Sequence, residues 1–152
     1  MSLVQVGKKV PDFKLASSSG EVFQLSKMKG KTVVLYFYPK DSTPGCTIEG
    51  QEFNDLLKDF RKKGVEVYGV SRDSIKSHCN FITKQGYKFE LLSDEDEKVC
   101  QLFDVIKEKN MYGKKVMGIE RSTFVIDENQ MLKNEFRKIK VEGHAQMILD
   151  LF

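Results

Sequence analysis

The sequence has few of the residues that hold a metal ion or a disulfide framework. Its 152 residues include three cysteines and two histidines. Cys46, Cys79 and Cys100 lie far apart in the chain, form no Cys-x-x-Cys pair and match no spacing typical of zinc ligands. The sequence therefore predicts neither a structural zinc site nor a thioredoxin-type dithiol motif.

Long apolar runs are also missing. No run approaches the length that spans a membrane, and the first residues, MSLVQVGKKVPDF, lack the apolar core of a signal peptide. We therefore expect a cytoplasmic protein without membrane contact, in which the cysteines are reduced thiols. The net charge is only +3, and the basic residues are scattered between acidic ones, so we expect no nucleic-acid binding. The densest basic stretch, residues 107–115, is predicted to be a solvated loop.

Strand and helix patterns alternate along one continuous chain without a linker, a repeat or a low-complexity segment. This length and pattern predict a single domain over residues 1–152. The expected elements are a hairpin-like opening in residues 16–31, strands 32–38, 65–71 and 89–94, helices through 53–60, 74–85 and 94–103, a hairpin of 122–127 and 131–139, and a terminal helix 143–152. The predicted fold class is α/β, with a mixed central sheet and helices on both faces.

Cys46 lies where the buried strand of residues 32–38 gives way to a helix. In sheets of this class, reactive sites lie at the carboxyl ends of the strands, where loops enter helices. A thiol ionises more readily near a helix N-terminus or a cation. Pro44 and Gly45 shape the turn so that the backbone N–H groups of Gly45 and Cys46 face the same side as the sulfur and can hold an oxygen of a substrate.

Two further side chains suit a reactive thiol. Thr43 offers a hydroxyl that both donates and accepts hydrogen bonds, three residues before Cys46. Arg121, at the start of a later predicted strand, offers a fixed cation. Nothing in the sequence alone requires Arg121 to reach Cys46.

The sequence gives no sign that either histidine is catalytic. A Cys–His hydrolase needs a base oriented toward the thiol, and neither His78 nor His144 lies in a motif of that kind. A structural role is the favoured interpretation for both.

Several separated motifs together resemble the peroxiredoxins. The core of the resemblance is Pro39-x-x-x-Thr43-x-x-Cys46, with Arg121 ahead of STFVID. Four longer stretches resemble the bacterioferritin-comigratory, or Q-type, subfamily: YPKDSTPGCTIEGQEF, SRDS, LLSDED and GIERSTFVID. The resemblance runs from about Val10 to the C-terminus. It implies a thioredoxin-like fold without the Cys-x-x-Cys pair of the thioredoxins.

The resemblance implies a role for each matching residue. Cys46 corresponds to the peroxidatic cysteine, which attacks the peroxide O–O bond and becomes a sulfenic acid. Thr43 corresponds to the residue that hydrogen-bonds the substrate, and Arg121 to the cation that stabilises the thiolate and polarises the peroxide. Pro39 corresponds to the residue that shields the thiolate from solvent. Glu49 matches a position that holds the active-site arginine in place.

The implied function is a thiol-dependent peroxidase, an antioxidant enzyme for hydrogen peroxide and organic hydroperoxides. The resemblance implies no metal, haem or nucleotide cofactor, a thioredoxin or glutaredoxin-type reductant as partner, and a monomer. The alternative is a non-enzymatic redox-sensing or partner-binding module on the same fold. That alternative needs a disabled site, yet Pro39, Thr43, Cys46 and Arg121 are all present.

The resolving thiol is where the sequence departs from the commonest family pattern. Many Q-type proteins have a resolving cysteine five residues after the peroxidatic one, but that position is Gln51 here. Another branch has it in the helix after SRDS, at the position of Ile82. Cys79 lies one turn earlier in that predicted helix, and Cys100 looks like a core residue. Resolution by Cys79, by Cys100 or by an external thiol is left open.

Overall fold

The computed structural model describes residues 3–152. The strands, in chain order, are β1 (Lys14–Ser17), β2 (Val22–Gln24), β3 (Thr32–Phe37), β4 (Val65–Ser71), β5 (Glu90–Ser93), β6 (Ile106–Met111), β7 (Lys114–Ile119), β8 (Ser122–Ile126) and β9 (Leu132–Phe136). The helices are η1 (Leu25–Met28), α1 (Pro44–Asp55), α2 (Leu57–Lys62), α3 (Ile75–Gln85), α4 (Lys98–Leu102) and α5 (His144–Leu149).

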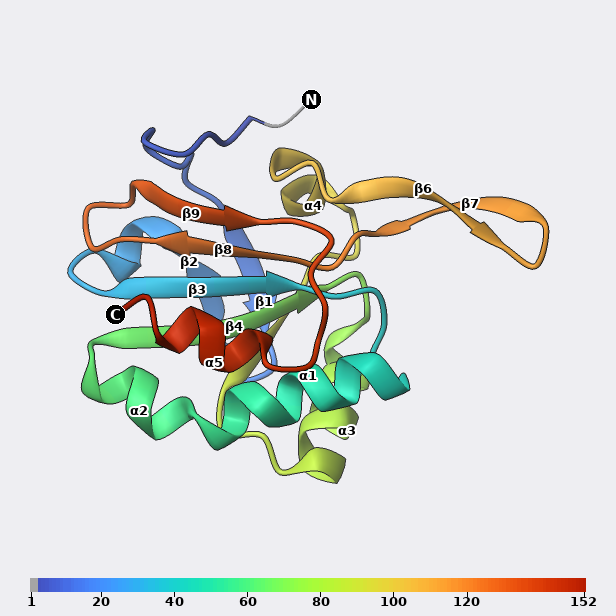
Figure 1. The fold of residues 1–152 in the computed structure, drawn as a ribbon, viewed down its shortest axis with the longest axis horizontal. Helices are drawn as coiled ribbons and strands as arrows, with labels where there is room; N and C mark the ends of the chain where they lie inside the picture. The colour runs from blue at the N-terminus through green and yellow to red at the C-terminus, as the bar shows by residue number, and fades with distance from the viewer. Residues whose placement is uncertain (1–2) are drawn as a thin grey trace.

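A mixed sheet runs through the centre of the molecule (Figure 1). Within residues 3–152 it has seven strands, in the order β2-β1-β5-β4-β3-β8-β9. The neighbours β3 and β4, and β4 and β5, are parallel, whereas β8 is antiparallel to β3. The strand β3 is therefore central, as its apolar residues on both faces predict.

Helices cover both faces of this sheet, as the predicted fold class requires. Side chains alternate between the faces of β3, so Leu35 and Phe37 join one apolar cluster and Tyr36 joins the other. The cluster with Phe37 also takes in the buried residues of α4. The cluster with Tyr36 packs under α1, α2, α3 and α5, which lie together on one side of the sheet (Figure 1).

Two of the expected helices differ in their bounds. The helix predicted through residues 53–60 is interrupted at Leu56, which separates α1 from α2. Asn54 and Asp55, which are weak helix formers, come just before the interruption. The helix predicted from residue 94 begins only at Lys98, because the Asp94 carboxylate reaches forward to accept the backbone N–H groups that open α4.

The prediction of a solvated loop at residues 107–115 is wrong. This segment forms most of the β6–β7 hairpin, which projects from the rest of the molecule (Figure 1). Tyr112 and Gly113 connect the strands with φ values of 53° and 78°. Two central residues with positive φ are typical of the tight turn that suits the twist of a hairpin. The turn therefore depends on a glycine that the charge pattern alone did not reveal.

Candidate functional site

The pairing of β3 with β8 brings Cys46 and Arg121 to the same place. Phe37 at the end of β3 is paired with Ser122 at the start of β8. Arg121 therefore lies beside the point at which the chain leaves β3. From that point, residues 38–43 lead into α1, and Cys46 is in the first turn of this helix.

The buried thiol of Cys46 contacts a guanidinium group. Cys46 is 1% exposed. Arg121 Nη1 donates to Cys46 Sγ at 3.4 Å and to Glu49 Oε1 at 2.7 Å. Glu49 is one turn after Cys46 in α1. The guanidinium thus links the sulfur to a carboxylate of the same helix, and three of the predicted site residues come together.

Charge in this cluster is partly desolvated. Burial raises the pKa of Glu49 and the nearby charge of Arg121 offsets only part of that rise, so the pKa of Glu49 is about 7. Burial by itself lowers the pKa of Arg121, but Glu49 and Cys46 more than compensate and the net shift is upward. Arg121 therefore stays a cation. Among residues 3–152, no side chain is hydrogen-bonded to Glu49 Oε2, which is buried.

The first turn of α1, which contains Cys46, leaves backbone donors without a partner in the helix. The first helical hydrogen bond runs from Thr47 N to Thr43 O. The N–H groups of Gly45 and Cys46 precede it in the helix, so they have no carbonyl within the helix to bind. The Thr43 hydroxyl does not cap the helix but donates to Lys40 O at 2.8 Å. Its oxygen keeps lone pairs that can accept a hydrogen bond from a bound molecule.

Gly45 allows Arg121 to come close to the start of α1. A Cβ atom built on Gly45 would lie 3.1 Å from Arg121 Nη2, closer than side chains normally approach. Pro39 and Thr43 are half-buried in the loop that precedes α1. The structure therefore groups Gly45, Cys46, Glu49 and Arg121 by contact or close approach, and it places Pro39 and Thr43 in the adjoining loop.

The other two cysteines lie away from this cluster. Cys79 is exposed on α3, and its Sγ is 3.5 Å from Ser18 O in the β1–β2 turn. Ile82, one turn later, packs against the apolar cluster that contains Cys46. Cys100 is buried in the cluster on the opposite face of the sheet, where burial, helped by the charge of Asp94, strongly raises its pKa. All three cysteines are free thiols.

Sequence reasoning missed two contacts that hold α1 in place. Tyr87 Oη donates to Thr47 O at 2.9 Å, and a Cβ atom on Gly50 would lie 2.3 Å from the same Oη. A glycine at position 50 is therefore required for Tyr87 to pack against the helix. Sequence reasoning also missed Asp41, a buried carboxylate between Pro39 and Thr43, although its place inside YPKDST was a visible signal.

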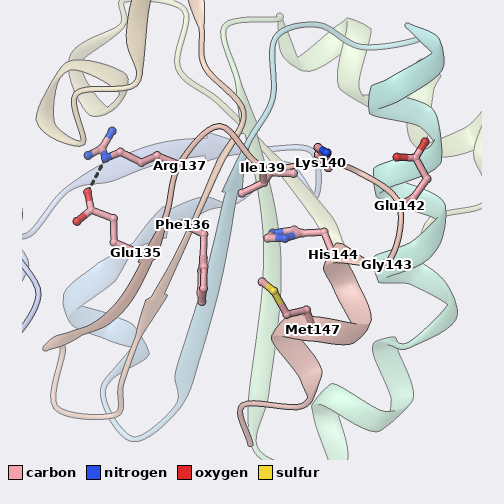
Figure 2. A pocket seen from close by; sticks show the side chains of 9 residues that line it. All are labelled: Glu135, Phe136, Arg137, Ile139, Lys140, Glu142, Gly143, His144 and Met147. Atoms are coloured by element: carbon pink, nitrogen blue, oxygen red, sulfur yellow. Dashed lines mark hydrogen bonds and ion pairs between the residues drawn. The ribbon is translucent and has the colours of Figure 1, made fainter.

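Two hollows lie near these elements. One, of about 460 Å³, lies between β9, the loop before α5 and α5 itself, with Phe136, His144 and Met147 in its lining (Figure 2). None of the proposed site residues lines it. The second, of about 370 Å³, is lined by Arg121 and by the lysines Lys109 and Lys138. It reaches the face of Arg121 that lies beside the β6–β7 hairpin.

Within residues 3–152, no group of three or more histidine, cysteine, aspartate or glutamate side chains is arranged to hold a metal ion. No helix in this part of the chain is long and apolar enough to cross a bilayer.

The cluster of Gly45, Cys46, Glu49 and Arg121 can perform the chemistry of a thiol with a fixed cation in contact with it and with backbone donors in the same helical turn.

Known proteins with similar sequences decide the family. The model of the AhpC/TSA family matches residues 6–135. Peroxiredoxin Bcp of Xanthomonas campestris is 56% identical over 138 residues, which cover 91% of this chain and 86% of the relative. The chain belongs to the peroxiredoxins. Peroxiredoxin Bcp of Bacillus subtilis is 47% identical, over 93% of this peroxiredoxin and 90% of the relative.

Solved structures agree with this assignment. A structure of Xanthomonas campestris peroxiredoxin Q matches with a TM-score of 0.90 and 51% identity, covering 99% of this chain and 95% of the other. A second, described as a study of the alkyl peroxide reduction activity of the Xanthomonas campestris bacterioferritin comigratory protein, matches with a TM-score of 0.90, 50% identity, and coverage of 99% and 96%. This peroxiredoxin therefore has the thioredoxin-like fold, is of the bacterioferritin-comigratory (Q) type and is a thiol peroxidase.

Proposed function

We propose that Cys46 is the thiol that attacks the peroxide. The observation that carries this proposal is the contact of Arg121 Nη1 with Cys46 Sγ, because it places a permanent cation and hydrogen-bond donor beside the sulfur, where a peroxide would react. Cys79 and Cys100 support the choice by contrast. Cys79 lies at the surface beside Ser18, and Cys100 is in an apolar environment that favours its neutral form.

In the proposed reaction, the Cys46 sulfur attacks one oxygen of the peroxide and the O–O bond breaks. The sulfur supplies the electron pair for the new S–O bond and becomes a sulfenic acid, while the other oxygen leaves and takes up a proton to become water or an alcohol. Negative charge develops on the leaving oxygen. Arg121, the Thr43 hydroxyl and the N–H groups of Gly45 and Cys46 are the donors proposed to stabilise that charge.

Two residues are proposed to support these groups. Glu49 holds the Arg121 guanidinium against α1 through the 2.7 Å ion pair, which fixes the direction of its donors. Pro39, half-buried in the loop between β3 and α1, shields one side of the thiolate from water. The chemistry uses only these side chains and backbone groups, so the proposed enzyme works without a cofactor.

We propose hydrogen peroxide and organic hydroperoxides as substrates. The alkyl peroxide reduction described for the Xanthomonas campestris relative supports the organic class. A thioredoxin or glutaredoxin-type dithiol is proposed to return Cys46 to the thiol. Action as a monomer in the cytoplasm is likewise a proposal. A single domain over residues 1–152 stays a prediction, since residues 1 and 2 lie outside the described part of the chain.

The test is peroxide consumption with dithiothreitol as the reductant. Wild type should consume peroxide rapidly and saturably, and Cys46→Ser should show no consumption above the reductant alone. The Cys100→Ser variant is a matched control, because it makes the same chemical change on the opposite face of the sheet. Full activity of Cys46→Ser, or loss of activity in Cys100→Ser alone, would refute the assignment of Cys46.

A further inference from the structure

The loop between β3 and α1 contains a carboxylate that has no role in the chemistry proposed above. The Asp41 side chain is 2% exposed. Its Oδ1 accepts a hydrogen bond from Tyr38 Oη at 2.6 Å. Its Oδ2 accepts one from Ser77 Oγ at 2.8 Å and lies 2.8 Å from His78 Nδ1. Ser77 and His78 belong to the first turn of α3, so Asp41 joins the loop to a different helix.

The imidazole ring of His78 has a hydrogen-bond partner at each of its two nitrogens. His78 is fully buried, and its Nε2 lies 2.9 Å from Leu92 O in β5. Both ring nitrogens of His78 thus face acceptors, a carbonyl and the Asp41 carboxylate. The ring is therefore fixed between the loop after β3 and the strand β5. Asp41 and His78 form a buried polar pair, and removing one partner leaves the other with an unsatisfied buried group, which is more disruptive than the net stabilisation of one hydrogen bond suggests.

The backbone of the loop is fixed at the same point. Asp41 N donates to Asp73 Oδ2 at 2.9 Å, and that oxygen also accepts the Ser71 hydroxyl at 2.6 Å. Ser71 ends β4, which is parallel to β3, so the loops that follow these two strands meet at one edge of the sheet. Asp41 is therefore fixed through both its side chain and its backbone.

The fixed residue lies between two proposed site residues, with Pro39 before it and Thr43 after it. Ser42, which separates Asp41 from Thr43, has a φ of 63°. A non-glycine residue adopts this left-handed conformation only at an energetic cost, so surrounding contacts have to maintain it. The contacts of Asp41 do so on one side of Ser42, together with the hydrogen bond from Thr43 Oγ1 to Lys40 O that spans it.

We propose that Asp41 and His78 are positioning residues for the peroxide reaction. The pair holds the loop so that the Thr43 hydroxyl faces the bound peroxide beside Cys46. It acts through Thr43 and does not touch the substrate. This inference rests on the proposed role of Cys46. Displacing a reacting group by about 1 Å can slow a reaction by about 100-fold, so a loosened loop has a measurable effect.

The test compares two reactions of the same thiol. Oxidation by hydrogen peroxide needs Thr43, whereas alkylation by iodoacetamide needs only a reactive, reachable Cys46. The Asp41→Asn variant keeps the shape of the side chain but removes its charge. We expect it to lower the second-order rate constant for peroxide by about tenfold or more, and the alkylation rate by less than about twofold. Ser77→Ala removes one hydrogen bond to Asp41 and should give a smaller loss with the same selectivity.

The control variant is Asp94→Asn. Asp94 is also a buried carboxylate, but it holds the start of α4 through the N–H groups of Val99 and Cys100. The free energy of unfolding of this variant, measured in urea, should be lower than that of wild type. Its rate constants for peroxide and for iodoacetamide should both equal those of wild type. Wild-type peroxide rates in Asp41→Asn or Ser77→Ala, or equal losses in the two reactions, would overturn the positioning role. Failure of wild-type Cys46 to react with peroxide would instead refute the proposed function.

Discussion

Arg121 Nη1 lies 3.4 Å from Cys46 Sγ, although 75 residues separate them in the sequence. The antiparallel pairing of β3 with β8 makes this contact, because Arg121 directly precedes β8 and Cys46 follows the loop after β3. The contact gives the thiol a cation that cannot lose its charge at any pH at which the protein is folded.

The first prediction concerns that cation. Arg121→Met should lower the second-order rate constant for peroxide by about 100-fold or more, the usual loss when a charge-stabilising donor is removed from an active site. Rapid-mixing kinetics of Cys46 oxidation measure it. Arg61→Met is the matched control, since Arg61 is half-exposed and pairs with Glu66 on another part of the surface. A wild-type rate in Arg121→Met would remove Arg121 from the mechanism.

The second prediction concerns the Thr43 hydroxyl. Thr43→Val should slow peroxide reduction by about tenfold or more, because a hydrogen bond worth about 1.4 kcal/mol in the transition state is lost. Thr43→Ser keeps the hydroxyl that now donates to Lys40 O and should retain most of the activity. Equal damage from both substitutions would show that the methyl group and its packing matter, and not the hydroxyl.

The third prediction uses the tight approach of Arg121 to Gly45. Alanine is the better helix former by about 1 kcal/mol, so Gly45→Ala should not destabilise α1 itself. Its Cβ would nevertheless push Arg121 Nη2 away from its 3.1 Å position. We expect a loss of several-fold in peroxide rate, and little further loss when Gly45→Ala is added to Arg121→Met. Additive losses in the double variant would mean that Gly45 acts through something other than Arg121.

The fourth prediction concerns stability and pH. Burial raises the pKa of Glu49 to about 7 in the folded protein, above its ordinary value of 4.5. The folded state therefore binds the proton more tightly, and this contribution to stability is fully present below pH 4.5 and is lost as the pH rises through about 7. Glu49→Gln should thus gain stability relative to wild type over this range, on the order of 1–3 kcal/mol. Urea unfolding at several pH values measures it, and a constant difference would contradict the shift.

The fifth prediction concerns the fate of the sulfenic acid. Cys79 Sγ points toward Ser18 O in the β1–β2 turn, so a disulfide with Cys46 requires α1 or α3 to open locally. If Cys79 resolves Cys46, peptide mapping of the peroxide-treated protein should find a crosslink between the two. Tyr87→Phe should then speed its formation, because it releases the hydrogen bond to Thr47 O that holds α1.

Persistent sulfenic or sulfinic acid on Cys46, with Cys79 still free, would instead indicate that an external thiol is the reductant. A crosslink from Cys46 to Cys100 is not expected, because Cys100 lies in the core on the other face of the sheet. The Cys79→Ser variant separates the two routes, since it should lose the crosslink and still turn over with dithiothreitol.

Much of the fold could be predicted from local patterns. The strand β3 was readable because all its side chains suit a buried environment, and α3 because Ser74 and Gly86 mark its two ends. Ser74 caps the helix by accepting Ser77 N, and Gly86 ends it with a φ of 73°. The β6–β7 hairpin was missed because its strands are largely exposed and carry no alternating apolar pattern.

The candidate site could be predicted only in part. The motif around Cys46 is contiguous in sequence, so its residues were found together. Arg121 was found by resemblance, because only the β3–β8 register brings it to the thiol. Asp41 and His78 were not connected at all, since their contact depends on the packing of α3 against the loop after β3. Single residues without a motif give no signal for contacts of this kind.

The central claim is that Cys46 alone performs the chemistry of peroxide reduction. Its most direct test is the mass of the intact protein, followed by peptide mapping, after one equivalent of hydrogen peroxide. The account predicts that wild type gains one oxygen atom on Cys46, or loses two hydrogen atoms as a disulfide that includes Cys46, and that Cys46→Ser stays unchanged under the same conditions. Oxidation of Cys79 or Cys100 at the wild-type rate in Cys46→Ser would contradict it.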